Sequence, residues 1–139
     1  MPIHPYLSFE GRAEEAIAFY RKAAGAEVQM LMRNRESPEP PPPDMVPPGS
    51  EDKIMHAQLT IGGSTVMLSD GMCGGAPNFC GVSLYLALPD ADAARRSFDA
   101  LADGGKVTMP LGPTFWSPCF GMLADRFGLG WMVTVEEQR

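Results

Sequence analysis

Two histidines are the side chains of this chain best suited to chemistry. His4 and His56 can each bind a metal ion, and near neutral pH an imidazole can also act as a base or hold a polar group of a ligand. With a carboxylate such as Asp70 they would make a site of two histidines and one carboxylate. His56 is also interpreted, more simply, as a hydrogen-bonded residue of a sheet or cavity. Both interpretations stay open at the level of sequence.

The three cysteines favour structural roles. They are odd in number and lack paired C-x-x-C spacing, so they predict neither a disulfide framework nor a zinc site. Cys73 and Cys80 flank a glycine-rich segment that offers no base or cation to generate a thiolate. Cys119 is close in sequence to Trp116 and Phe120, where burial would leave the thiol inert.

Length and charge narrow the classes of function. The chain has 139 residues, of which 45% are hydrophobic, and this suits one globular domain spanning residues 1–139. A net charge of −6 argues against nucleic-acid binding and favours neutral or cationic ligands. No apolar run approaches the ~18 residues of a membrane span. Since residues 1–4 do not resemble a signal peptide, we expect a cytoplasmic protein without membrane contact.

The elements that must position these side chains are duplicated. At an offset of 79 residues, Tyr6 falls on Tyr85 and the segment from Ala13 to Val28 falls on a second segment of similar pattern. Further along, an offset of 65 residues places Met67 on Met132. The second copy is thus shorter by 14 residues, a difference that the Pro-rich loop 34–52 of the first copy absorbs.

Periodicity and turn residues predict a β-α-β-β-β order in each copy. Module one, residues 2–70, has expected strands at 3–9, 27–33, 53–61 and 64–69 and a helix at 13–24 that Gly25 ends. After a linker at 71–79, module two, residues 80–137, has expected strands at 81–88, 106–109, 118–124 and 130–136 and a helix at 90–103 with Asp90 as its N-cap. We therefore predict an α+β fold in which two tandem modules curve mixed sheets around a cavity.

Alternation along the strands predicts which side chains line that cavity. Met55, Ala57, Leu59 and Ile61 should lie under the helix of module one, and Trp131 has the same parity in module two. The methionines at positions 30, 32, 55, 109 and 122 are interpreted mostly as core filling, with Met67 and Met132 as the exceptions. Asp125 and Arg126 are interpreted as an ion pair in a turn. Trp116 precedes a clear strand pattern, so its facing stays open. The opposite, cavity-lining face is predicted to carry His4, Tyr6, Ser8, His56, Gln58, Thr60, Thr65, Met67, Ser69, Ser83, Tyr85, Ala87, Gly130, Met132 and Thr134.

Several motifs carry a family resemblance over nearly the whole chain. They are the Ala13-x-x-Ala16-x-x-Phe19-Tyr20 helix, Thr114-Phe115-Trp116, Asp125-Arg126-Phe127-Gly128, Trp131 and the paired β-α-β-β-β copies. Together they resemble the vicinal oxygen chelate superfamily, and within it the PhnB-like, glyoxalase/bleomycin-resistance-like proteins. The resemblance implies a fold like that of glyoxalase and dihydroxybiphenyl dioxygenase, and a homodimer. It is less informative about function, because the superfamily holds both enzymes and drug-binding proteins.

Metal-dependent members take ligands from the first and last strands of each copy, and the matching positions here are His4, Met67, Ser83 and Met132. Thioethers suit Cu(I) rather than the divalent ions of such enzymes, so we predict no catalytic metal and no cofactor. No G-x-G-x-x-G joins a strand to a helix, which argues against a methyltransferase or nucleotide-dependent enzyme.

We expect a small-molecule binding protein whose ligand is a neutral or cationic molecule, aromatic ones included. The ligand-binding residues predicted for it are His4, Tyr6, His56, Met67, Ser83, Tyr85, Trp116 and Met132. One alternative is a metal-dependent lyase or dioxygenase that uses His4, His56 and a carboxylate. A second is a purely structural or interaction protein.

Overall fold

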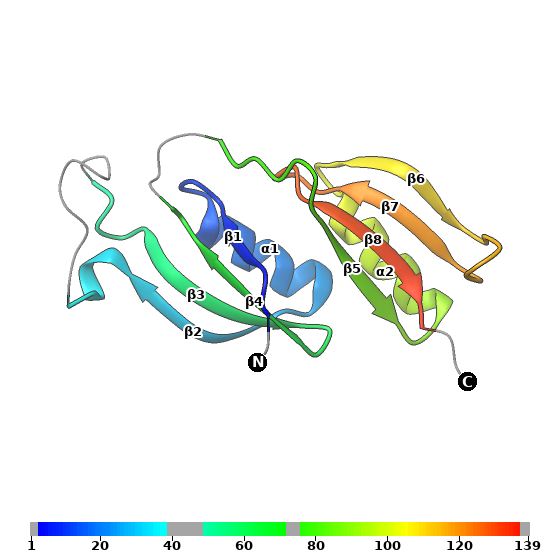
Figure 1. Ribbon diagram of the computed structural model, residues 1–139, viewed down its shortest axis with the longest axis horizontal. Coiled ribbons are helices and arrows are strands. Elements are labelled where there is room, and N and C mark those ends of the chain that lie inside the picture. The colour runs from blue at the N-terminus through cyan, green and yellow to red at the C-terminus, as the bar shows by residue number, and fades with distance from the viewer. Residues whose placement is uncertain (1–2, 39–48, 72–75, 137–139) are drawn as a thin grey trace. The chain divides into compact units, whose positions relative to one another are not determined.

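The computed structural model describes residues 3–38, 49–71 and 76–136. The chain divides into two compact units, Met1–Arg21 with Gly25–Pro77 and Lys22–Ala24 with Asn78–Arg139. The division after Pro77 falls inside the predicted linker. Each unit has a four-stranded sheet of its own and one α-helix (Figure 1).

Unit 1 follows the β-α-β-β-β order expected for module one. Its elements are β1 Tyr6–Ser8, α1 Ala13–Ala24, β2 Glu27–Arg33, the 3-10 helix η1 Asn34–Glu36, β3 Ile54–Ile61 and β4 Ser64–Ser69, although the division assigns the last three residues of α1 to unit 2. The sheet order is β1-β4-β3-β2, with β1 parallel to β4 and the other pairs antiparallel. Gly62 and Gly63 have φ of 58° and 85°, so the turn between β3 and β4 uses a conformation that glycine alone adopts easily.

Unit 2 repeats this order. Its elements are β5 Ser83–Leu88, α2 Ala91–Ala102, β6 Lys106–Gly112, β7 Phe120–Ala124 and β8 Gly130–Val135. The sheet order is β5-β8-β7-β6, the counterpart of the order in unit 1. Asp90 caps α2 as predicted, since its carboxylate accepts a hydrogen bond from the Ala93 amide at 2.8 Å. Strand β6 is longer than expected and includes Pro110, which an edge strand can accommodate.

Strand pairing confirms both offsets of the repeat. Tyr6 lies opposite Met67 in unit 1, and Tyr85 lies opposite Met132 in unit 2. An offset of 79 relates the two tyrosines and an offset of 65 relates the two methionines, so the same pair recurs in both sheets. The duplication in sequence is therefore also a duplication of register.

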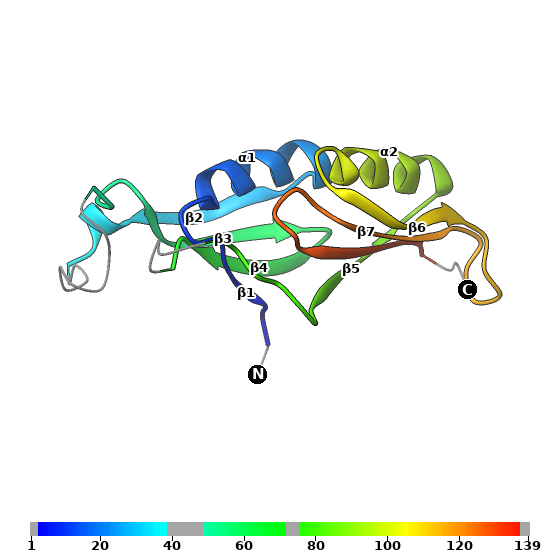
Figure 2. The ribbon, with the colours of Figure 1, turned by 90° about the horizontal axis from the view of Figure 1, so that it is seen from above.

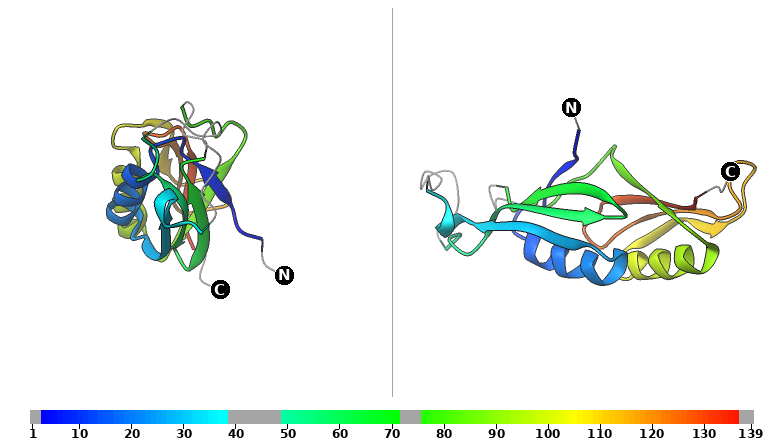
Figure 3. Two further views of the ribbon diagram at one scale, coloured as in Figure 1. Left: turned by 90° about the vertical axis from the view of Figure 1, so that its left-hand side faces the viewer. Right: turned by 90° about the horizontal axis from the view of Figure 1, so that it is seen from below.

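Each helix covers one face of its own sheet, as Figures 2 and 3 show. The side chains on this covered face alternate with exposed ones along the strands. In unit 1 the buried hydrophobic residues include Leu7, Phe9, Ala16, Ile17, Tyr20, Ala57, Leu59, Val66 and Leu68. In unit 2 they include Leu86, Ala94, Phe98, Leu101, Leu111, Leu123, Trp131 and Val133. The prediction that Trp131 is core is confirmed.

Two methionines differ from the prediction. Met55 was expected under α1, but it is only half-buried and Ile54 takes the core position at 1% exposure. The cause is an irregularity in register, because Met32 pairs with His56 while the next residue, Arg33, pairs with Ile54. Met30 was expected to fill core, yet it is 42% exposed because it lies on the edge strand β2.

Hydrogen bonds join the two ends of the predicted loop 34–52. The buried Asn34 side chain donates to the Ser50 carbonyl at 2.8 Å, and the Asn34 amide donates to the Lys53 carbonyl at 2.9 Å. Arg33 forms an ion pair with Glu14 of α1 at 2.6 Å, and that carboxylate raises the pKa of the Arg33 guanidinium. The prolines from residue 40 to 48 lie outside the described residues.

A pair of glycines in unit 2 tests how tightly α2 packs on its sheet. A Cβ on Gly121 would lie 2.7 Å from Phe98 Cε2 and 3.0 Å from Leu111 Cα, whereas a Cβ on Gly112 meets nothing within 4 Å. We predict that Gly121→Ala lowers the free energy of unfolding by about 1–3 kcal/mol through overpacking. Gly112→Ala, the control, should change it by less than about 0.5 kcal/mol. Urea unfolding measures both, and equal effects would contradict the packing.

Candidate functional site

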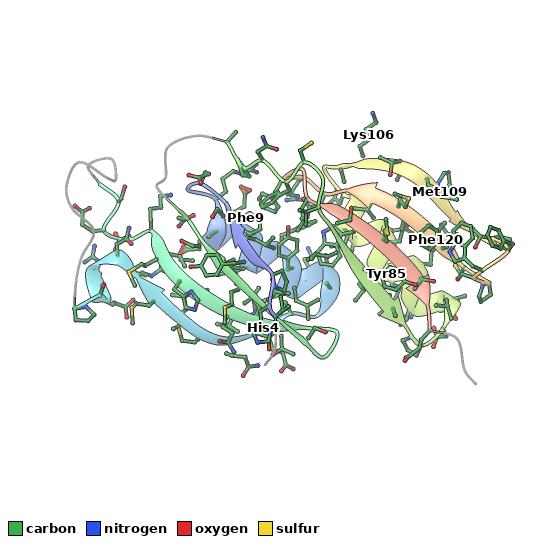
Figure 4. All side chains as sticks on the ribbon, in the orientation of Figure 1. His4, Phe9, Tyr85, Lys106, Met109 and Phe120 are labelled. Carbon is green, nitrogen blue, oxygen red and sulfur yellow. The ribbon has the colours of Figure 1, made fainter. Side chains whose placement is uncertain are left out.

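The face of each sheet that its helix leaves uncovered, here called the open face, carries a matched line of side chains. In unit 2 a tyrosine and three methionines lie opposite one another across all four strands. They are Tyr85 on β5, Met132 on β8, Met122 on β7 and Met109 on β6. Tyr85 is 63% exposed and the three methionines are half-buried, so the line is accessible. Figure 4, which looks onto this face, labels Tyr85 and Met109.

Unit 1 has the equivalent line. Tyr6 on β1 lies opposite Met67 on β4, which lies opposite Gln58 on β3 and then Met30 on β2. The repeat relates Met30 to Met109 by the same offset of 79 that relates the tyrosines. We call these two lines the tyrosine–methionine rows. They differ at the third position, where unit 1 has the amide of Gln58 and unit 2 has the thioether of Met122.

In unit 2 the row is flanked by two further lines of paired residues, which differ in character. On one side, paired positions carry the small residues Ser83, Gly130 and Ala124 with Lys106 at the edge. On the other side are Ala87, Thr134, Phe120 and Gly112, again at paired positions. The row thus has small residues on one side and the aromatic ring of Phe120 on the other.

The loop from Thr114 to Pro118 covers the flanking line that contains Thr134 and Phe120. The Trp116 ring meets Phe120 edge to face at 5.3 Å between centroids, and the Ser117 hydroxyl lies 2.9 Å from the Thr134 hydroxyl. An open hollow of about 200 Å³ is lined by Thr114, Phe115, Trp116, Ser117 and Pro118. Trp116 is 49% exposed, so its facing, which the sequence left open, is toward solvent at one end of the open face of unit 2.

In unit 1 the polar groups of the site gather at Tyr6. The Tyr6 hydroxyl lies 3.2 Å from His56 Nδ1, and the two rings stack at 5.6 Å between centroids and 25° between planes. The structure thus brings together two of the predicted residues. The hydrogen bond orients the imidazole, whose Nε2 atom can then bind a polar group on a ligand.

The remaining predicted residues have more varied positions. His4 precedes β1 and is exposed at the N-terminal arm (Figure 4), and Ser83 is exposed at the start of β5. Ser69 and Thr134 were expected on the cavity-lining face, but both are buried. Thr134 is buried because the loop at Ser117 lies over it. Sequence reasoning missed Met30, Met109 and Met122 as members of the open face, although the offset of 79 between Met30 and Met109 was a usable signal.

Asp70, the carboxylate suggested as a partner of the two histidines, has a structural role. Asp70 is 1% exposed, and its carboxylate accepts hydrogen bonds from the amides of Ala13 and Ile54, both at 2.7 Å. It therefore holds two main-chain donors rather than pointing toward either histidine. Across residues 3–38, 49–71 and 76–136, no three His, Cys, Asp or Glu side chains are grouped so that they could hold a metal ion.

Asp125 and Arg126, expected as an ion pair, each have other partners in the structure. Asp125 is buried, and its carboxylate accepts from the amides of Phe127 and Leu129 and from the Trp131 indole. Arg126 instead pairs with Asp103 at 3.3 Å. Hydrogen bonds from these N–H groups replace the water that the buried carboxylate has lost. In turn, the carboxylate provides an acceptor for N–H groups that are themselves buried.

The cysteines that the structure describes are free thiols. Cys80 is exposed and Cys119 is half-buried, while Cys73 lies outside the described residues. Among the helices of the described ranges, none combines the length and apolar character needed to cross a membrane.

Comparison with known proteins places this arrangement in a family. The family model described as 3-demethylubiquinone-9 3-methyltransferase matches residues 2–134. Protein PA1353 of Pseudomonas aeruginosa has a similar structure with a TM-score of 0.83 and 40% identity, covering 99% of each chain. A putative 3-demethylubiquinone-9 3-methyltransferase, the PhnB protein of Bacillus cereus, follows with a TM-score of 0.78 and 30% identity over 98% of this chain and 100% of that one.

A structure with much lower sequence identity has a similar fold. The fosfomycin resistance protein FosX of Listeria monocytogenes has a TM-score of 0.63 at 10% identity, covering 99% of this chain and 93% of that one. This likeness concerns the fold alone, and it agrees with the α+β arrangement of two tandem β-α-β-β-β modules. By its family match and its similar structures, the chain belongs to the PhnB-like family, the one whose model is described as 3-demethylubiquinone-9 3-methyltransferase.

Proposed function

We propose that this protein binds a small neutral or cationic molecule with an aromatic or otherwise apolar body on its open faces, without a catalytic divalent metal. The observation that carries the proposal is the tyrosine–methionine row, which recurs at the same register in both units. A row of partly exposed tyrosine and methionine is costly to leave in water and adapts well to varied apolar ligands.

Each open face, taken by itself, offers a ligand different chemical groups. Unit 1 offers polar groups, because the His56 imidazole and the Gln58 amide lie on the same face as Tyr6 and Met67. Unit 2 offers the thioethers of its row and the Trp116 ring, which packs on Phe120 and can stack on a planar or cationic group. The net charge of −6 favours attraction of a cation over an anion.

The absence of divalent-metal chemistry from this proposal follows from the donor atoms. The positions that resemble the metal-ligand positions of the superfamily carry His4, Met67, Ser83 and Met132, and a thioether is a poor ligand for Zn²⁺ or Mn²⁺. Asp70 is held by two amides and cannot complete a site with His4 and His56 without giving them up. We also leave methyl transfer out, because each described sheet mixes parallel and antiparallel strands and no strand leads through G-x-G-x-x-G into a helix. A cytoplasmic homodimer remains our expectation.

A planar cationic probe, thioflavin T, tests the proposal. Binding should be saturable, and Tyr85→Ala or Met132→Ala should weaken it by about three- to tenfold, the loss expected for one aromatic or thioether contact. Val107→Ala is the matched control, because Val107 is 43% exposed on β6 but pairs with the core residue Leu123 rather than with the row. Fluorescence titration measures all four proteins. Equal weakening in the control, or no saturable binding, would contradict the site.

The metal-free part is tested separately by thermal unfolding with Zn²⁺, Mn²⁺ or Ni²⁺. We expect melting temperatures that barely change, because a ligand stabilises only the state that binds it. A large rise that disappears in His4→Ala would overturn this part and favour a lyase or dioxygenase.

A further inference from the structure

Three thioethers meet on adjacent strands in unit 2. Met109 on β6 lies directly opposite Met122 on β7, and Met122 lies directly opposite Met132 on β8. Residues at directly opposite positions point to the same face of a sheet, with Cβ atoms about 4.5–5.5 Å apart. A Cβ on the neighbouring Gly121 would meet Phe98 of α2, so Met122 points away from the helix. All three side chains are half-buried on the open face.

Thioether sulfur is a soft ligand that prefers Cu(I) and similar monovalent ions to hard divalent ones. A methionine side chain is unbranched and rotates freely, so the two outer residues, whose strands lie about 10 Å apart, can lean toward the central one. We propose that Met109, Met122 and Met132 form a three-thioether site for Cu(I). This inference goes beyond the proposed binding of a small molecule and does not depend on it.

The surroundings suit a monovalent soft cation. The residues beside the row on one side, Gly130 and Ala124, are small. Lys106 is the charged residue at the paired positions on that side, and it is exposed on the edge strand, where its ammonium can extend into solvent. The chain as a whole carries a net charge of −6.

Unit 1 supplies an internal control for the idea. Its tyrosine–methionine row has Met30 and Met67 at the outer positions but Gln58 at the centre. An amide oxygen is a hard ligand and does not replace a thioether toward Cu(I). The row in unit 1 should therefore not bind the ion, although it has the same register and a similar exposure.

The experiment follows the thioethers themselves in the full-length chain. Cysteine thiols are also soft ligands, so the three cysteines, Cys73, Cys80 and Cys119, are replaced by serine. Methionine methyl groups carry ¹³C, and their NMR signals are recorded while Ag(I), a redox-inert substitute for Cu(I), is added, followed by Cu(I) under anaerobic reducing conditions. One equivalent should shift the signals of Met109, Met122 and Met132 together and leave those of Met30 and Met67 in place.

Two variants of the central position make the test specific. Met122→Gln copies unit 1 and should weaken binding at least tenfold, and Met122→Leu should do the same while conserving the volume of the side chain. Gln58→Met should create a second site of similar affinity. The proposal is overturned if the three signals do not move together, if Met30 and Met67 move equally, or if both Met122 variants bind as tightly as the parent while their spectra show a folded protein.

Discussion

Replacing Asp70 by alanine is expected to lower the free energy of unfolding by about 3–5 kcal/mol. The Asp70 carboxylate, at 1% exposure, accepts from the amide of Ala13 at the start of α1 and from the amide of Ile54 at the start of β3. The alanine variant leaves both amides without an acceptor inside unit 1, and each buried orphan costs about 1–3 kcal/mol. It also removes a negative charge from the N-terminus of α1. Urea unfolding at constant pH measures the loss.

Asp90→Ala is the matched control, because Asp90 caps the equivalent helix of unit 2. Its carboxylate accepts from one amide, that of Ala93, and it is exposed, so water can replace it at a cost of about 1 kcal/mol. Asp70→Asn should fall between the two, since the amide keeps one acceptor oxygen but turns a donor toward the other N–H. A loss for Asp70→Ala as small as that for Asp90→Ala would show that Asp70 is not the link between α1 and β3.

These two aspartates show how far the sequence predicts the fold. Asp90 was recognisable because an N-cap carboxylate and the amide that donates to it are three residues apart, and such short-range chemistry is visible in a sequence pattern. Asp70 acts across 57 residues on a helix whose own N-cap position, Arg12, makes no side-chain cap. Its role depends on where β4 ends relative to α1, which only the folded unit determines. From the sequence it was therefore assigned to a possible metal site instead.

The strands were predicted well because the duplication supplies a check on register. Two offsets, found by matching residues, agree with the pairing of Tyr6 with Met67 and of Tyr85 with Met132. The alternation of buried and exposed residues predicted the wrong face where the register shifts, as at Met55. One inserted residue reverses the face to which the adjoining part of the strand points. Alternation also failed where a loop covers a sheet, as at Thr134.

The site was predicted less completely than the fold. The sequence placed Tyr6, Met67, Tyr85 and Met132 on one face of their strands, and the structure adds their partners on the strands beyond. Met30 and Met109 lie on β2 and β6, the edge strands, where one side of the strand has no neighbour to bury it. Hydrophobicity alone assigns such methionines to a core. Their exposure follows from the order of the strands, which short-range pattern does not contain.

Removing the carboxylate of Asp125 should be as damaging in unit 2 as removing Asp70 is in unit 1. Asp125→Ala is expected to lower the free energy of unfolding by about 3–5 kcal/mol, because three buried donors lose their acceptor. They are the amides of Phe127 and Leu129 and the indole N–H of Trp131, which lies 2.9 Å from Asp125 Oδ2. Trp131 is 2% exposed, so water reaches that indole N–H poorly. Urea unfolding measures the loss.

A double-mutant cycle assigns part of that loss to the indole. Trp131→Phe removes the indole N–H, so the effect of Asp125→Ala should be smaller in that background, with a coupling of about 1–2 kcal/mol. In the Asp125→Ala variant the indole proton should also exchange faster with solvent, which NMR detects directly. Arg126→Ala is the control, because Arg126 pairs with the exposed Asp103 and should contribute less than about 1 kcal/mol. If Arg126→Ala proved as damaging as Asp125→Ala, the turn would depend on its cation rather than on acceptors for buried N–H groups.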